Sequence, residues 1–377
     1  MKKSTILLLM TSLWFSSCCV DDPLYILGAK GVSSVQDYSD AASIWTYKSD
    51  FQFDHIRTIF YKDAAISVIN YNDHTAILSH NAETGERYWF QNNLGHYRAK
   101  LTGGCIQKDN ILVLSDNNFT VAIGLDEGNV LWKAETTYGQ TQISLANNKV
   151  LKTTNQTGIC KVYEIDIFSG KQVKLFHRTY VENGKYEPDY SYPMVYKNER
   201  DEDIFILVGG DRHRKSSQIL AYNLSTKTTL WNKRYDNENH VVSKVVLKND
   251  KIFFATKTSV RCIDLGGNEV WAQSVDRFLG PNMILENDKL WLSSGLVLDE
   301  QTGEERSDFS KNDAWVASSQ NYVSWCNSSI FFYDKKGDSS HNYGIGFSGF
   351  GCPHPQKELY YTSKGNVLFC LDLDKMK

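Results

Sequence analysis

The side chains that most often carry out catalysis are scattered along this chain and form no known local pattern. The nine histidines lie far apart and none belongs to a His-Glu-x-x-His pair, so the zinc-hydrolase signature is missing. The chain also lacks the Gly-x-Ser-x-Gly nucleophile turn, the Gly-x-x-x-x-Gly-Lys phosphate loop and the Asp-x-Asp-x-Asp calcium loop. Distant residues can still converge in a fold, but the local sequence supports no catalytic residue and no metal ligand. We therefore expect a protein that is not an enzyme.

The cysteines favour structural roles. Six of the eight follow the amino-terminal segment: Cys105, Cys160, Cys262, Cys326, Cys352 and Cys370. None belongs to a Cys-x-x-Cys pair, which disfavours a metal site. Cys262 and Cys370 stand in equivalent places just before an Asp, as small buried apolar side chains do. Export permits a disulfide, and Cys352 with Cys370 is the candidate pair, although the spacing also allows both to stay reduced.

The amino terminus has the features of an export signal. Lys2 and Lys3 precede an apolar run from Ile6 to Phe15, which is too short to span a bilayer and fits a signal core. The run ends in Phe15-Ser16-Ser17-Cys18, which resembles the lipobox of bacterial lipoproteins, whose cysteine is diacylated and becomes the mature amino terminus. The resemblance implies lipidation of Cys18. Phe15 departs from the smaller residue usual there, Cys19 is the alternative site, and a plain secretory signal is the alternative interpretation.

The chain accordingly divides into a signal peptide (1–17), a lipid-anchored tether (18–40) and one folded domain (41–377). Asp21 and Asp22 resemble the acidic tether of some surface-exposed lipoproteins, so the periplasmic and cell-surface sides of the outer membrane both stay open. No later stretch reaches the 18 to 20 apolar residues of a membrane-spanning helix. Membrane contact is expected through lipid only.

Composition favours an all-β domain without nucleic-acid binding. The 377 residues are 41% apolar, enough to bury a large core. Tyr, Phe and Trp number 21, 18 and 9 against 6 Pro, which suits half-buried pleated surfaces. The net charge of -3 offers no electrostatic footprint for DNA or RNA.

A degenerate repeat runs through the domain. A turn residue is followed four positions later by Trp in Gly85–Trp89, Gly128–Trp132, Lys227–Trp231 and Gly267–Trp271. The same turn recurs without Trp at Gly170, Gly303 and Gly337, where Lys174, Ser307 and His341 stand at the fourth position. Most steps between turns are close to 40 residues, which is the size of a four-stranded propeller blade. The fixed offset of Trp89, Trp132, Trp231 and Trp271 predicts packing between neighbouring blades, with stacking on sugars as the alternative.

Each turn follows an Asp or Asn whose side chain can bond the backbone two residues ahead. These residues are Asn81, Asp126, Asp166, Asn223, Asp264, Asp299 and Asp334. The last unit supplies strands around 358–362 and 366–372 but stops before a Trp strand, while Ser43–Tyr47 is an unassigned strand of that type. We predict that Ser43–Tyr47 completes the final blade and closes the ring. Seven turns plus this composite blade make eight blades, and the short step before Gly337 leaves seven as the alternative.

The segments Ala122–Trp132 and Leu220–Trp231 resemble the PQQ-like β-propeller repeat, and the likeness covers everything after about residue 40. A signal and lipid cysteine followed only by such repeats is similar in architecture to the propeller lipoprotein of the bacterial outer-membrane barrel-assembly machinery. The quinoprotein dehydrogenases of this family place a vicinal cysteine ring against pyrroloquinoline quinone, with calcium. The adjacent cysteines here, Cys18 and Cys19, lie in the signal junction, so we expect no cofactor.

One interval breaks the period and is the candidate partner-binding surface. The step from Gly170 to Lys227 is about fifteen residues longer than its neighbours, and insertions in repeat proteins collect on loops. It carries residues of the kinds enriched at interface hot spots: Tyr186, Tyr190, Tyr192, Tyr196, Arg212 and Arg214. The alternative is that the tyrosines only fill a longer hairpin and the charged residues are solvated. The sequence thus predicts a lipid-anchored envelope scaffold that binds proteins, with an exported small-molecule or glycan binder, or a quinone enzyme, acting at the central channel as the alternative.

Overall fold

The computed structural model describes the propeller in eighteen stretches. They are residues 42–49, 55–71, 74–92, 94, 104–116, 119–135, 140–146, 148–156, 159–179, 188–211, 216–236, 243, 245–275, 282–309, 315–326, 329–337, 339–343 and 351–376. The predicted signal peptide and tether, with Cys18, lie outside the described residues.

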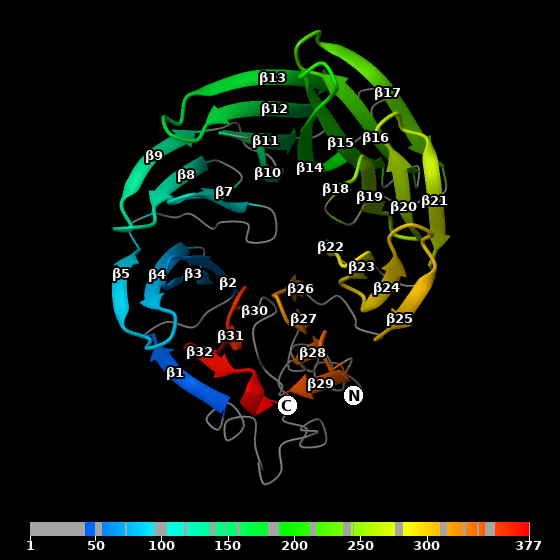
Figure 1. Cartoon of the computed structure of the whole chain (residues 1–377). Helices are drawn as coiled ribbons and strands as arrows, with labels where there is room; N and C mark the ends of the chain where they lie inside the picture. Colours follow the sequence, from blue (N-terminus) through cyan, green and yellow to red (C-terminus); the bar gives the residue numbers. More distant parts are fainter. Residues whose placement is uncertain are drawn as a thin grey trace, which may run out of the picture.

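Within the described residues, thirty-two strands form eight four-stranded antiparallel sheets, which are arranged as blades in a ring (Figure 1). The first four blades are blade 1, β2 (His55–Tyr61), β3 (Ala64–Tyr71), β4 (His74–Asn81) and β5 (Arg87–Gln91); blade 2, β6 (Cys105–Lys108), β7 (Ile111–Ser115), β8 (Phe119–Gly124) and β9 (Val130–Glu135); blade 3, β10 (Gln140–Ala146), β11 (Lys149–Gln156), β12 (Ile159–Asp166) and β13 (Gln172–Thr179); and blade 4, β14 (Pro188–Lys197), β15 (Asp203–Asp211), β16 (Ser216–Asn223) and β17 (Thr228–Tyr235).

The other four are blade 5, β18 (Val246–Lys248), β19 (Lys251–Ala255), β20 (Ser259–Asp264) and β21 (Glu269–Ser274); blade 6, β22 (Met283–Glu286), β23 (Lys289–Leu292), β24 (Leu296–Asp299) and β25 (Glu305–Asp308); blade 7, β26 (Trp315–Ser318), β27 (Tyr322–Cys326), β28 (Ile330–Asp334) and β29 (Ser339–Tyr343); and blade 8, β30 (Cys352–Pro353), β31 (Leu359–Lys364), β32 (Val367–Asp372) and β1 (Ser43–Lys48). The short 3-10 helix η2 (Asp374–Met376) follows β32. The prediction of an all-β, eight-bladed propeller is confirmed, and seven blades are excluded.

Burial follows the position of each strand within its blade. The middle strands β7 and β8 are buried almost throughout, because neighbouring blades cover both of their faces. The outer strands β9 and β17 are exposed or half-buried along their length, and burial largely alternates because successive side chains of a strand point to opposite faces of the sheet. Buried apolar clusters lie between consecutive blades, so the core is a ring of separate joints.

The ring closes through its two ends. β1 pairs antiparallel with β32, with Ser43 opposite Leu371 and Lys48 opposite Val367. The prediction that the amino-terminal strand completes the last blade is confirmed. The candidate disulfide in this blade is wrong: Cys352 and Cys370 are both unbridged. Both pair with Tyr361 from opposite sides, so two strand spacings of about 4.8 Å separate their backbones, beyond the reach of a disulfide.

In the turns between the third and fourth strands, an Asp or Asn side chain accepts backbone N–H groups and a later residue adopts positive φ, as expected, except at Gly337 and Asp126. Asn81 Oδ1, for example, accepts hydrogen bonds from the backbone N–H groups of Glu83 and Thr84, both at 2.9 Å. The turn residue at Lys227 takes φ of 59° even without being glycine, whereas Gly337 does not adopt positive φ. The prediction that the Asp126 side chain bonds the backbone of its own turn is wrong. Gly124 stands four residues before Gly128, as Asn81 stands before Gly85, and it has no side chain to accept such bonds. The Asp126 carboxylate instead accepts a hydrogen bond from Lys62 of blade 1.

No helix within the described residues is long and apolar enough to cross a membrane.

Candidate functional site

Within the described residues, tryptophans of the outermost strands dock five of the eight blades onto the next one. At five joints the indole lies against the turn glycine of the following blade. Its Nε1 donates to a backbone carbonyl two or three residues before that glycine. These pairs are Trp45 with Ala82 (3.1 Å), Trp89 with Leu125 (3.1 Å), Trp132 with Ile167 (2.7 Å), Trp231 with Leu265 (2.8 Å) and Trp271 with Glu300 (3.0 Å). Each indole therefore satisfies its polar group while its ring fills the joint. Trp45, on the closing strand, was not among the predicted repeat tryptophans.

Three joints lack this docking. Between blades 6 and 7, and between blades 7 and 8, aromatic residues from the inner strands fill the space. Trp325 of blade 7 donates its indole N–H to the Leu292 carbonyl at 2.8 Å, and Phe332 meets Tyr360 edge-on with centroids 5.0 Å apart. At the joint between blades 3 and 4, Lys174 and Lys227 replace Trp and Gly, and both are exposed.

Ion pairs join neighbouring blades at the end of the ring that carries these turns, which we call the turn face. Lys62 of blade 1 meets Asp126 of blade 2 at 2.6 Å, and both side chains are exposed. Lys248 of blade 5 meets Glu300 of blade 6 at 2.7 Å, and the Glu300 side chain is fully buried. The two pairs have similar nitrogen–oxygen distances, but the carboxylate is exposed in one and buried in the other, so their energetic contributions should differ.

Replacing Lys248 with methionine is therefore expected to lower the free energy of unfolding by about 2 kcal/mol, because it leaves a buried carboxylate without its cation. Lys62→Met, the matched change at the exposed pair, is expected to cost no more than about 0.5 kcal/mol. Urea denaturation of both variants measures the difference. Equal losses would show that burial of Glu300 does not govern the contribution of the pair.

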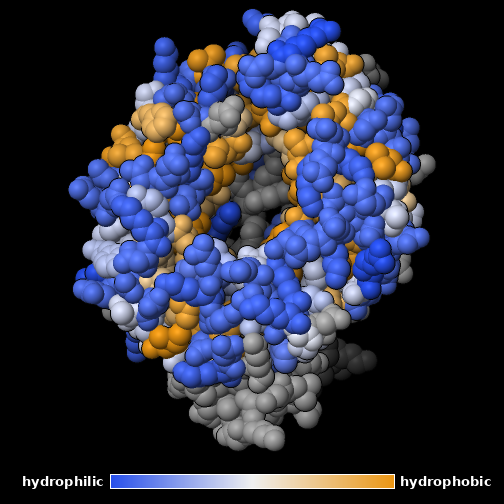
Figure 2. All heavy atoms as spheres, viewed as in Figure 1, coloured by the Kyte–Doolittle hydropathy of each residue, from blue (hydrophilic) through white to orange (hydrophobic). Residues whose placement is uncertain are grey.

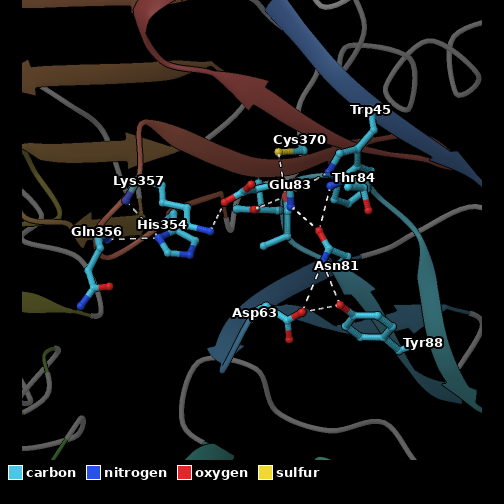
Figure 3. Close-up of polar contacts among 12 residues, drawn as sticks. Trp45, Asp63, Asn81, Glu83, Thr84, Tyr88, His354, Gln356, Lys357 and Cys370 are labelled. Atoms are coloured by element: carbon cyan, nitrogen blue, oxygen red, sulfur yellow. Dashed lines mark hydrogen bonds and ion pairs between the residues drawn. The ribbon is translucent and has the colours of Figure 1, made fainter.

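The seam between blades 8 and 1 is the joint where the two chain ends meet, and Figure 3 shows its polar contacts. The Ala82 carbonyl accepts hydrogen bonds from Trp45 Nε1, from Tyr361 Oη at 2.8 Å and from Cys370 Sγ at 3.7 Å. Lys357 of blade 8 pairs with Glu83 of blade 1, which holds the pKa of the Glu83 carboxyl below its usual value. One backbone oxygen thus ties three strands of blade 8 to blade 1.

The structure describes three of the six predicted partner-binding residues, Tyr190, Tyr192 and Tyr196, and all three belong to β14 of blade 4. Tyr186, Arg212 and Arg214 lie outside the described residues. Their attachment points are described: Pro188, where β14 begins, pairs with Asp211, where β15 ends. The segments 180–187 and 212–215 therefore join blade 4 side by side.

The described tyrosines of this surface lie on β14. Tyr190 pairs with Gly209 of β15, whereas Tyr192 falls in the irregularity of the ladder between Ser191 and Met194. Tyr196 packs half-buried against the cluster between blades 4 and 5, and burial raises its pKa. Tyr196 thus contributes to the core, which the sequence pattern did not indicate.

The central opening is the other place where a ligand can enter, and Figure 2 shows the ring hollowed there. Within the described residues, no group of three or more His, Cys, Asp or Glu side chains is arranged to hold a metal ion. The described thiols also include no adjacent pair. The described residues therefore do not fit a calcium–quinone centre, and we derive no step through one.

Known proteins with this architecture serve different roles. The structure of BamB from Moraxella catarrhalis has a TM-score of 0.58 at 13% identity, covering 87% of this chain and 96% of that one. The Dos1 propeller has a TM-score of 0.65 at 10% identity (90% and 97% covered), and the dihydro-heme d1 dehydrogenase NirN has 0.58 at 11% (91% and 78% covered). At these identities the likeness is one of fold.

No curated protein sequence matches the chain. A family model described as "Outer membrane protein assembly factor BamB" matches residues 73–307, which is more than half of the chain. The chain therefore belongs to the PQQ-like β-propeller family of the outer membrane protein assembly factor BamB.

Proposed function

We propose that this protein is a lipid-anchored, non-catalytic scaffold of the bacterial cell envelope that binds protein partners through the loop end of blade 4. Its signal peptide (1–17) directs export, Cys18 carries the lipid at the outer membrane, and residues 18–40 are the tether. Membership of the BamB family and the lipobox-like Phe15–Cys18 segment support this proposal. Nucleic acid and cofactors have no part in it.

The observation that carries the partner surface is the paired start of β14 and end of β15. The segments 180–187 and 212–215 border these two paired residues, in the unit where the repeat is longest. Their tyrosine and arginine side chains are of the kinds suited to protein recognition.

The test is a crosslinked pull-down of the membrane-anchored protein. A specific envelope protein should be recovered with the wild type and lost with Cys18→Ala, because the soluble form no longer concentrates at the membrane. The triple variant Tyr186→Ala, Arg212→Ala, Arg214→Ala should reduce recovery at least about tenfold, as removal of hot-spot residues does.

Lys257→Ala is the matched control, because Lys257 lies in the β19–β20 hairpin at the same end of the neighbouring blade. It should leave recovery unchanged. Recovery that survives the triple variant would place the partner elsewhere on the ring. A quinone absorbance band in the purified protein, with no protein partner, would instead favour the channel-based enzyme.

A further inference from the structure

His80 is a buried imidazole at the closing seam that has no polar partner. It lies on β4 with 1% of its surface exposed. Neither Nδ1 nor Nε2 has a hydrogen-bond partner among the described residues. Buried polar groups without partners are uncommon and need an explanation.

The neighbours of His80 belong to the strand that closes the ring. Its ring centroid lies 5.4 Å from that of Trp45 and 5.0 Å from that of Tyr47, and both residues are on β1. These rings lack an anionic acceptor for an imidazolium, although their faces attract cations weakly. Packing of β1 on blade 1 therefore suits the neutral form of His80.

The charged and titratable groups around His80 strengthen its preference for the neutral form. On β5, Arg87 pairs with His80 in the ladder and repels a second positive charge. On β1 the titratable residue beside it is Tyr47. Trp45, the other aromatic neighbour of His80, packs with Tyr361 and Cys370 of blade 8, whose pKa values are raised by burial. Burial first, and Arg87 second, lower the pKa of His80 from 6.5 to about 4.

We propose that His80 makes closure of the ring acid-sensitive, so that protonation of its imidazole detaches β1 from the seam while the other joints stay closed. The release uncovers the outer edge of β32, which is an apolar strand able to pair with another strand. β1 is held by its ladder with β32, by the Trp45 hydrogen bond to Ala82 and by its packing on blade 1. The seam is the natural place for such opening because no turn joins β1 to β32, whereas each other outermost strand described continues from its neighbour in the sheet.

The direction of the pH effect on ring closure follows from proton linkage. The closed state binds the His80 proton more weakly than the open state, whose imidazole titrates near 6.5. The stability of closure is complete above that pH and is lost as the pH falls toward about 4. Between pH 7 and pH 4.5 the opening equilibrium should rise about 50-fold. The Lys357 ammonium lowers the pKa of Glu83, and the Tyr88 hydroxyl lowers that of Asp63, so these seam carboxylates lose their charge less readily than free ones as the pH falls.

Hydrogen–deuterium exchange of the purified full-length protein tests the proposal. The peptide containing Ser43–Lys48 should lose protection about 50-fold between pH 7 and 4.5, after correction for intrinsic exchange. The corresponding outer strand β21 of blade 5 should keep its protection. Carbon-13 titration of the histidines should show His80 still neutral at pH 5.

His80→Leu, and His80→Phe if the leucine variant folds poorly, should abolish the acid response of β1 because they remove the proton site. His354→Gln is the matched control: this histidine of the same seam is 7% exposed, but its Nδ1 accepts two backbone N–H groups. It should retain most of the response. An unchanged acid response in the His80 variants, or a β1 that gains protection in acid through attraction to the aromatic rings, would overturn the proposal.

Discussion

Replacing Trp271 with alanine is expected to lower the free energy of unfolding by about 3–5 kcal/mol, as removal of a buried tryptophan does. The side chain is 9% exposed, packs in the core between blades 5 and 6, and donates its indole N–H to Glu300. The substitution leaves a cavity in the joint and removes the only donor that the structure gives to that carbonyl within the described residues. Urea denaturation followed by circular dichroism measures the loss.

The repeat supplies an internal control for this experiment. Lys174 occupies the same repeat position at the joint between blades 3 and 4, and its side chain is exposed. Lys174→Ala should change the free energy of unfolding by no more than about 0.5 kcal/mol, as a surface substitution does. A large loss at Lys174, or a small one at Trp271, would show that position in the repeat does not identify the residues that hold the joints together.

Gly128→Ala should destabilise the protein by about 3 kcal/mol, whereas Gly365→Ala should cost about 1 kcal/mol. Both glycines have positive φ, 73° and 58°, where an L side chain is strained by about 1 kcal/mol. A β-carbon at Gly128 would overlap the Trp89 ring, whereas one at Gly365 would have no atom within 4 Å. The difference between the two variants measures the cost of displacing the docked indole.

A double-mutant cycle separates the two contributions. In a Trp89→Ala background, Gly128→Ala should cost only about 1 kcal/mol, because the ring that clashed with the new methyl group is gone. Thermal or urea unfolding of the four proteins gives the coupling. Additive effects of the two substitutions would mean that the indole yields to the methyl group without loss, against the contact seen at this joint.

The sequence was most informative where the same physical requirement recurs. Gly85, Gly128 and Gly267 are recognisable because each must present a left-handed turn without a β-carbon to a neighbouring indole. The closing role of Ser43–Tyr47 was predictable because a strand without a blade and a blade without a strand complete each other. The glycine requirement recurs at several blades, and the closing strand follows from counting the strands of each repeat.

The remaining contacts could not be read from local pattern because residues distant in sequence supply them. Asp126 resembled a turn-holding residue, yet the neighbouring blade offered Lys62, and Gly124 stands four residues before the turn glycine. Trp325 replaces the repeat tryptophan at its joint from an inner strand, outside the repeat register. His80 sits in an ordinary strand position, and its isolation depends on Trp45 and Tyr47 arriving from the other end of the domain.

The pairing of β1 with β32 also sets the order in which this protein can be made. β1 is the first strand of the propeller to leave the ribosome, whereas β32, the strand that it must pair with, is the last. Blades 1 to 7 can form as they are synthesised, because their strands are consecutive. The closing joint has to wait until β32 has been synthesised, and a chain that stops before β32 would leave β1 without a partner.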